Sequence, residues 1–381
     1  MTPAEASFAC DALVVGAGIT GALVAERLTR MGRKVVVIDR EHPSLGSTVA
    51  STAMLLWEID RPLCQLAQLY DFERAVRGYR ASHYAIRGLV ALIAQHRIAC
   101  QMRPRPSLYL AAEDDSLVHA EAALRSRVGL PSQFLDHKAL AQRFSMMRAG
   151  AVLSQDAAEA DPVRLAQGML ELSVVRGARL MQADAVAFES AGSVVHVGLA
   201  SGLQIEARDV VLATGYVMPD VVRPTAQQAA SSWAIATIRQ PQNLWPLQAL
   251  VWEATQDYHY ARTTVDGRVI LGGEDDRRLI EPNARDAATA EKVTVLKRYL
   301  SAFWPQASTQ VEFAWSGAFD STDDGLPLIG PVPGCKNIFA AFGYGGNGIT
   351  FSFLAAELIG KLLSGGTSRL IDDFAIDRDV S

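Results

Sequence analysis

The chain has 381 residues, of which 49% are hydrophobic and 20% charged, and its formal net charge is −5. This length exceeds one ordinary domain and is enough for two domains that share a large buried core. The mildly acidic balance leaves no broad basic face, which argues against nucleic-acid or anionic-membrane binding, and 29 glycines against 16 prolines exclude collagenous and disordered classes.

Neither a metal site nor a disulfide framework is expected. Four widely spaced cysteines are present and form no CxxC pair: Cys10, Cys64, Cys100 and Cys335. Residues 1–10 lack the basic and apolar regions of a signal peptide, and the most apolar stretch, 338–363, is interrupted by glycines and charged residues. We therefore expect a reduced, cytoplasmic chain without a transmembrane span.

The N-terminal segment has the pattern of a βαβ unit. The apolar run Ala12–Val15 ends in Gly16-Ala17-Gly18-Ile19-Thr20-Gly21, a helix-like stretch follows, and a second apolar run, Lys34–Ile38, ends at Asp39. A GxGxxG motif followed about twenty residues later by an acid is typical of a dinucleotide-binding unit. The motif alone does not distinguish NAD from FAD.

Each residue of this motif has a physical reason. Gly16 permits the tight turn, Gly18 lets the backbone approach a pyrophosphate, and Gly21 lets the helix pack against the strands. The helix start presents bare N–H groups to the phosphates, and its dipole favours their charge. Asp39 would accept hydrogen bonds from the ribose hydroxyls of the adenosine.

Two later segments suggest a second half of the same dinucleotide. The strand-like run Arg208–Leu212 ends in Ala213-Thr214-Gly215, a small-residue bend. The strand Asn337–Ala341 leads through Gly343-Tyr344-Gly345-Gly346-Asn347-Gly348 into the helix Ile349–Leu363. A glycine-rich loop before a helix presents N–H groups to an anion, which suits the flavin N1–C2=O edge because that edge is negative in the reduced flavin.

Together these segments make the chain resemble the D-amino acid oxidase-like family of FAD-dependent oxidoreductases, in its glycine oxidase and sarcosine oxidase branch. The matching segments occur in family order along the chain: Val14–Gly21, Asp39, Gly46–Thr48, Ala213–Gly215, Asp324–Gly330 and Gly343–Gly348. The resemblance implies an α/β fold, in which a Rossmann-like FAD-binding domain is interleaved with an α+β substrate domain built on a mainly antiparallel sheet.

The domains are expected to be discontinuous. We assign residues 1–78, 150–215 and 324–381 to the FAD-binding domain, and residues 79–149 and 216–323 to the substrate domain. The patterns predict helices at Ser82–His96, Ser116–Val128, Lys138–Arg143, Val163–Val175 and Ala287–Phe303. They also predict a strand at Trp233–Arg239 and a hairpin at Ala261–Gly272 that turns at Asp266-Gly267.

The resemblance also indicates which residues hold the cofactor. The candidates are Gly16, Gly18, Ile19, Thr20, Gly21, Asp39, Arg40, Gly46, Ser47, Thr48, Ser51, Thr52, Val186, Ala213, Thr214, Gly215, Gly343, Gly345, Gly346, Asn347, Gly348 and Ile349. Some relatives attach the flavin covalently through a His or a Cys, but Ala50 and Gly317 occupy the corresponding positions. We therefore predict FAD that is bound non-covalently.

The substrate side departs from the family pattern. Glycine oxidase-like proteins carry an Arg that clamps the substrate carboxylate, and Phe319 stands in its place. An aromatic ring cannot form a bidentate pair with a carboxylate. Tyr258, Tyr260 and Arg262 alternate and would share one strand face, so Arg262 is the best replacement anion anchor. Phe319 and Tyr344 would wall the substrate side of the flavin.

The function implied is oxidation of a C–N bond in a small amine or amino-acid-like substrate, by hydride transfer to flavin N5. The reduced flavin would then pass its electrons to O2 or a quinone-type acceptor. Three alternatives remain open: an FAD-dependent dehydrogenase of a 2-hydroxy acid or polyol phosphate, a flavoprotein subunit that relays electrons within a complex, and an NAD-only dehydrogenase. The oligomeric state and the stereochemistry of the substrate stay open as well.

Overall fold

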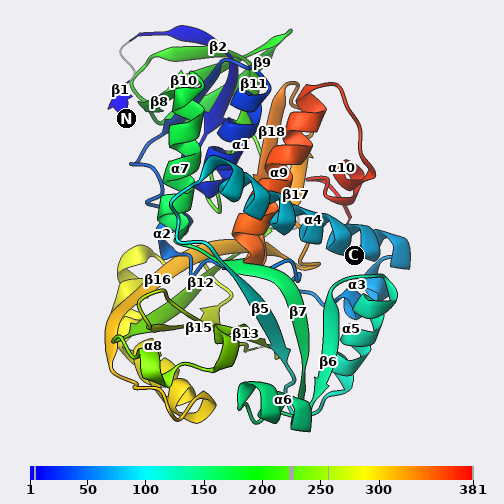
Figure 1. Ribbon diagram of the computed structural model, residues 1–381. Helices are drawn as coiled ribbons and strands as arrows, with labels where there is room; N and C mark the ends of the chain where they lie inside the picture. The colour runs from blue at the N-terminus through cyan, green and yellow to red at the C-terminus, as the bar shows by residue number, and fades with distance from the viewer. Residues whose placement is uncertain (4–5, 223–226, 256, 380–381) are drawn as a thin grey trace.

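Two mixed β-sheets, one above the other in Figure 1, organise the chain in the computed structural model, which describes residues 1–3, 6–222, 227–255 and 257–379. The predicted mixed α/β fold class is confirmed. Among these described residues, no helix is long and apolar enough to cross a membrane.

The first sheet has a parallel centre, as a dinucleotide-binding domain requires. Its parallel strands are β1 (Thr2–Pro3), β8 (Arg179–Gln182), β3 (Val35–Asp39), β2 (Phe8–Val15), β11 (Gln204–Leu212) and β18 (Ile338–Phe342). Antiparallel strands complete it: β10 (Val194–Leu199), β9 (Ala185–Ala191) and β17 (Leu328–Pro331). Val14 on β2 pairs with Val37 on β3 and with Val211 on β11, so the apolar runs that the sequence predicts as strands lie side by side.

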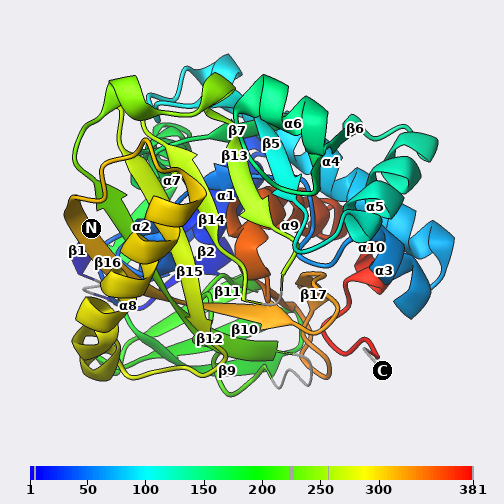
Figure 2. The same cartoon turned by 90° about the horizontal axis from the view of Figure 1, so that it is seen from below.

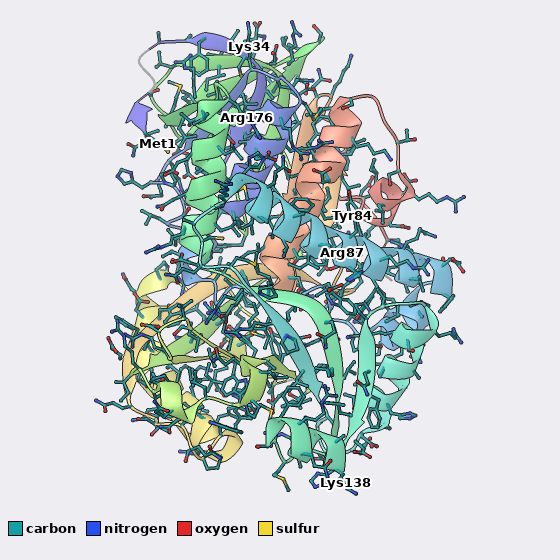
Figure 3. The ribbon with its side chains drawn as sticks, in the orientation of Figure 1. Met1, Lys34, Tyr84, Arg87, Lys138 and Arg176 are labelled. Atoms are coloured by element: carbon teal, nitrogen blue, oxygen red, sulfur yellow. The ribbon has the colours of Figure 1, made fainter. Side chains whose placement is uncertain are left out.

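Helices cover one face of this sheet. They are α1 (Ile19–Arg30), α7 (Pro162–Val175) and α9 (Gly348–Leu363), with α4 (Phe72–His96) crossing α9 (Figure 1). Asp161 caps α7 by accepting a hydrogen bond from the backbone N–H of Arg164 at 3.0 Å, and Pro162 occupies the first turn. At the other end of α7, Arg176 donates to Glu26 of α1 at 2.6 Å (Figure 3).

The second sheet is antiparallel except where β13 runs parallel to β5. Its strands, in spatial order, are β16 (Val311–Thr322), β12 (Gln227–Thr237), β15 (Val269–Asp276), β14 (Tyr260–Thr263), β13 (Leu250–Glu253), β5 (Arg103–Leu110), β7 (Gly150–Glu159) and β4 (Met54–Leu55), with β6 (Ser132–Asp136) beside β7. Figure 2 shows this sheet from below, with α1 and α9 behind it.

The predicted hairpin is confirmed, because β14 and β15 pair antiparallel across a turn in which Gly267 has φ +82°. The other helices and helical turns are α2 (Ser47–Ala50), α3 (Leu63–Leu69), α5 (Ser116–Arg127), α6 (His137–Phe144), α8 (Pro282–Phe303), α10 (Arg369–Asp373), η1 (Pro241–Asn243), η2 (Pro246–Gln248) and η3 (Gly345–Asn347). Helix α8 packs on β12, β15 and β16.

Two details differ from the boundaries expected from the sequence. The division at residue 78 falls inside α4, which begins at Phe72 because Asp71 caps it and accepts from Arg74 N at 2.7 Å. The division at residue 150 falls where β7 begins, and β7 pairs within the second sheet and not the first. A cut at residue 78 would therefore divide α4, whereas the whole of β7 lies in the second sheet.

Candidate active site

A cavity of about 910 Å³ lies between the two sheets, at the upper end of the roughly 300–1,000 Å³ usual for ligand sites. Gly16, Asp39 and Ala213 line it, and they stand at or just after the carboxyl ends of β2, β3 and β11. The opposite side is lined from the second sheet, for example by Tyr260 of β14 and Phe319 of β16. Binding outside the carboxyl ends of parallel strands is the general rule for such sheets.

The GxGxxG turn has no space for side chains at two of its glycines. Gly16 has φ +108°, and a Cβ there would lie 2.3 Å from the carbonyl oxygen of Ala213. A Cβ on Gly21 would lie 1.8 Å from the carbonyl oxygen of Gly16, so α1 packs directly on the turn. Gly18 caps α1 without a side-chain hydrogen bond; Ile19 N donates to Thr48 Oγ1, and the other N–H groups of the first turn suit an anion.

Asp39 joins the turn to the end of β3. One carboxylate oxygen accepts a hydrogen bond from Ala17 N at 2.6 Å and the other from Glu41 N at 2.9 Å. The carboxylate also lines the cavity, where a ribose can reach it. Nearby, the hydroxyl of Ser44 is buried without a hydrogen-bond partner, and this residue lines the cavity too. Such an unpaired donor fits a polar ligand, and sequence reasoning did not select it.

The loop 46–54 is docked onto the second sheet. Ser47 Oγ donates to the carbonyl oxygen of Ala318 at 2.8 Å, and Trp315 Nε1 donates to that of Ala50 at 2.9 Å. A Cβ on Gly317 would lie 2.9 Å from the Cβ of Ala50, so the two positions at which relatives attach flavin covalently meet each other here as small residues. Thr48 of this loop accepts from Ile19 N at 3.0 Å and steadies the start of α1.

The second glycine-rich loop is held by carboxylates. Asp60 accepts a hydrogen bond from Gly346 N at 2.8 Å, and Asp320 accepts one from Gly343 N at 2.9 Å. A Cβ on Gly345 would lie 2.1 Å from a carboxylate oxygen of Asp60, so this glycine lets the loop lie against the acid. Helix α9 starts at this loop, and its N-cap residue, Asn347, makes no side-chain cap.

Most of the residues selected from the sequence surround this one cavity. The selected residues that line it are Gly16, Gly18, Ile19, Thr20, Asp39, Arg40, Gly46, Ser47, Thr48, Ser51, Thr52, Val186, Ala213, Thr214, Gly215, Tyr258, Tyr260, Phe319, Tyr344, Gly345, Gly346, Asn347, Gly348 and Ile349. The selected residues that do not line it are Gly21, Gly343 and Arg262.

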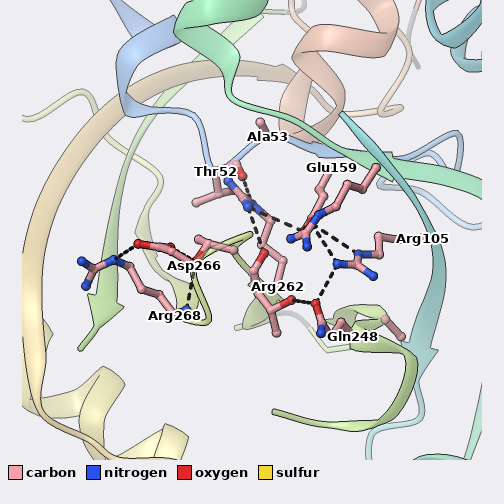
Figure 4. Close-up of polar contacts among 12 residues, drawn as sticks. Thr52, Ala53, Arg105, Glu159, Gln248, Arg262, Asp266 and Arg268 are labelled. Atoms are coloured by element: carbon pink, nitrogen blue, oxygen red, sulfur yellow. Dashed lines mark hydrogen bonds and ion pairs between the residues drawn. The ribbon is translucent and has the colours of Figure 1, made fainter. Parts of the chain in front are cut away.

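The placement of Arg262 corrects the expectation that it replaces the family's anion anchor. Tyr258 precedes β14, and its ring centroid lies 6.0 Å from that of Tyr260 at the cavity wall. Arg262 instead donates through Nε to the carbonyl oxygen of Thr52 and lies 3.7 Å from Glu159 (Figure 4). Arg262 is 8% exposed, and a buried guanidinium needs such partners.

Glu159 is the centre of this arginine cluster. It is 1% exposed and is paired with Arg105 at 3.2 Å as well as with Arg103. Burial lowers the pKa of Arg262, and Glu159 opposes that shift. The cluster lies behind Thr52, so it supports the loop 46–54 and does not present a positive charge to the cavity.

The part of the cavity formed with the second sheet is aromatic and acidic. Sequence reasoning missed several of its residues, which carry no local motif: Asp60, Trp252, Asp275, Trp315 and Asp320. Burial raises the pKa of Tyr258, Tyr260 and Tyr344, so all three remain protonated hydrogen-bond donors at neutral pH. Burial likewise raises the pKa of Asp60, to about 6, and Asp275 adds to that shift.

The chain belongs to the DAO family of FAD-dependent oxidoreductases, because the family's sequence model matches residues 11–362. It is 27% identical to the gamma-glutamylputrescine oxidoreductase of Escherichia coli strain K12, over 97% of this chain and 87% of that protein. The structure of glycine oxidase from Geobacillus kaustophilus is similar with a TM-score of 0.82 at 19% identity, covering 98% and 100% of the two chains. L-proline dehydrogenase from P. horikoshii matches with a TM-score of 0.82 at 17% identity, covering 97% of each chain.

The protein is therefore an FAD-dependent oxidoreductase, and the NAD-only alternative is wrong. The structure fits the cofactor. The N-cap residues of α1 and α9 make no side-chain cap, so the N–H groups at these helix starts suit anionic groups, and residues from both helix starts line the cavity. When bound, FAD supplies an acceptor for a hydride from the substrate. The chain itself supplies binding, orientation and exclusion of water.

Proposed function

We propose that this enzyme oxidises the C–N bond of an amine whose reacting carbon carries no carboxylate. The observation that supports this is the charge of the cavity wall. Among the described residues that line the cavity, the basic ones are Arg40 and His42, which stand one and three positions after Asp39 at the dinucleotide end. At the end formed with the second sheet, Asp60 and Asp275 line the wall instead.

An amine substrate fits such a wall. Carboxylates attract a protonated amine, and aromatic faces bind cations and methylene groups. A carboxylate on the reacting carbon would face acids without an arginine clamp. In the proposed reaction the carbon loses a hydride and the nitrogen a proton, which yields an imine, and water then hydrolyses the imine to a carbonyl compound. The name of the E. coli relative, an oxidoreductase of gamma-glutamylputrescine, supports an amine as the substrate class.

Anaerobic mixing tests this proposal directly. Primary and secondary alkylamines should bleach the flavin absorbance of the enzyme, and α-amino acids of equal chain length should do so much more slowly. Faster reduction by the α-amino acids would contradict it. Arg262 would have suited the hydroxy-acid or polyol-phosphate alternative as an anion anchor, but Arg262 does not line the cavity. A protein that no amine reduces, and that is recovered only in a complex, would favour the electron-relay alternative.

Some finer points belong to the same proposal. We place the reaction in the cytoplasm, with O2 or a quinone-type carrier as acceptor, and we retain the interleaved domains. The four cysteines form no disulfide, which is compatible with a reducing compartment.

A further inference from the structure

We propose that Asp60, Asp275 and Asn347 form a subsite for a second, non-reacting ammonium group, so that the preferred substrates are diamines. This inference rests on the proposed amine oxidation and specifies its substrate class. The three residues come from distant parts of the chain: the segment after β4, the strand β15, and the loop before α9. All three line the same cavity.

Two oxygens of the subsite, on Asn347 and Asp275, are hydrogen-bond acceptors that lack donors, whereas Asp60 accepts from Gly346 N and from Asn347 Nδ2. Asn347 is 3% exposed and lines the cavity; its Nδ2 donates to the carbonyl oxygen of Glu58 at 2.8 Å and to Asp60 Oδ1 at 3.3 Å, while its Oδ1 is buried without a partner. Asp275 Oδ1 is also buried without a partner, although Tyr258 and Ser232 lie within hydrogen-bonding reach of the carboxylate. An ammonium group carries three donors and no acceptor, which is what these oxygens need.

No protein cation fills the subsite among the described residues. Arg61 follows Asp60 but donates to the carbonyl oxygen of Asp323, outside the cavity lining. Burial raises the pKa of Asp275, and His259 and Lys292 oppose that shift, but Lys292 Nζ donates to the carbonyl oxygen of Glu274 at 2.9 Å. His259 is likewise bound to Glu274, at 3.0 Å.

Asp60 is negatively charged at neutral pH. Its side chain is exposed to the cavity that it lines. Burial raises its pKa to about 6, and the charge of Asp275 contributes to the shift. At pH 7.5 Asp60 is ionised for most of the time, and the ionised form of Asp275 repels it. A cation that enters relieves this repulsion.

The same charges are unsuited to the reacting nitrogen. Loss of a hydride from the carbon requires a free electron pair on the nitrogen, and a carboxylate in contact with that nitrogen would keep it protonated. A distal ammonium group, by contrast, stays protonated throughout the reaction. We therefore assign the acids to the group that does not react.

The test uses the FAD-loaded enzyme with amines of matched length. Wild-type kcat/KM should be higher for 1,4-diaminobutane and 1,5-diaminopentane than for butylamine and pentylamine, by about tenfold or more, the effect of a charge-assisted hydrogen bond. In Asp60→Asn and in Asp275→Asn, this diamine-to-monoamine ratio should fall by about tenfold. Asp276→Asn is the matched control, because Asp276 pairs with Arg278 and does not line the cavity. An unchanged ratio in both cavity variants would overturn the subsite.

Binding separates the subsite from the reaction. The probe is 1,4-diguanidinobutane, a dication of similar length whose guanidine groups resist oxidation, followed by its perturbation of the flavin absorbance. If no amine reduces the flavin but the probe binds, and binds about tenfold more weakly in Asp275→Asn, the proposed function fails and the cation subsite stands. If amines reduce the flavin but the probe binds wild type and both cavity variants equally, the function stands and the subsite is overturned.

Discussion

Replacement of Arg262 by Met is expected to weaken FAD binding and not to act on the substrate directly. Arg262 Nε donates to the carbonyl oxygen of Thr52 in the loop 46–54, and Nη1 donates to the carbonyl oxygen of Thr263 at 3.0 Å. Only the first of these bonds joins the loop to the second sheet, because Thr263 is the neighbouring residue of the same strand.

The magnitude follows from what the substitution leaves behind. Glu159 keeps Arg103 and Arg105 as partners, so the variant does not create the isolated buried charge that would cost about 3–5 kcal/mol. One hydrogen bond from a charged donor to the loop is lost, worth about 1.5–3 kcal/mol. If about 2 kcal/mol of that is lost from FAD binding, the Kd for FAD rises about 30-fold.

The assay is titration of the flavin-depleted protein with FAD, followed by the change in flavin fluorescence, and then steady-state kinetics at saturating FAD. Arg278→Met is the control, because Arg278 lies on the surface with 80% of its side chain exposed and pairs with Asp276. The reasoning would be refuted if Arg262→Met bound FAD as tightly as wild type while its KM rose selectively for anionic substrates. That result would restore Arg262 as an anion anchor.

Three further predictions concern stability and the cofactor. Arg378→Met should lower the free energy of unfolding in urea by about 3–5 kcal/mol at pH 7, because it leaves the fully buried Asp324 without its bidentate partner. Burial alone would raise the pKa of Asp324, but Arg378 holds that pKa below its usual range. The loss of unfolding free energy should therefore shrink as the pH falls below about 4 and Asp324 is protonated. A loss that does not change with pH would contradict this. Asp60→Asn should raise Tm at pH 8 and change Tm little at pH 4. The reason is that a carboxyl whose pKa is raised to about 6 in the folded state destabilises the folded state only when it is ionised. Equal Tm shifts at pH 8 and pH 4 would count against this prediction. Acid precipitation should release the flavin into the supernatant, and flavin retained in the pellet would show a covalent bond.

The cofactor half of the site could be predicted because its determinants are local. The turn at Gly16 and the helix start at Gly18 lie within a single βαβ unit, and GxGxxG encodes a conformation and a contact that only glycine permits. The hairpin at Asp266-Gly267 and the cap at Asp161 are equally local. In each case, nearby residues supply both the backbone conformation and its hydrogen bonds.

The substrate half depended on partners that are distant in sequence. Alternation along a strand indicated one face for Tyr260 and Arg262, but the buried charge of Arg262 is satisfied by Glu159, which a separate strand supplies. The acids Asp60 and Asp275 stand more than 200 positions apart and carry no motif. The strands β4 and β15 are not adjacent in the second sheet, so only the tertiary structure brings both acids to one cavity. The residue pattern therefore specifies an FAD-dependent oxidoreductase, whereas the charge of the cavity wall is decided by how the two sheets are assembled.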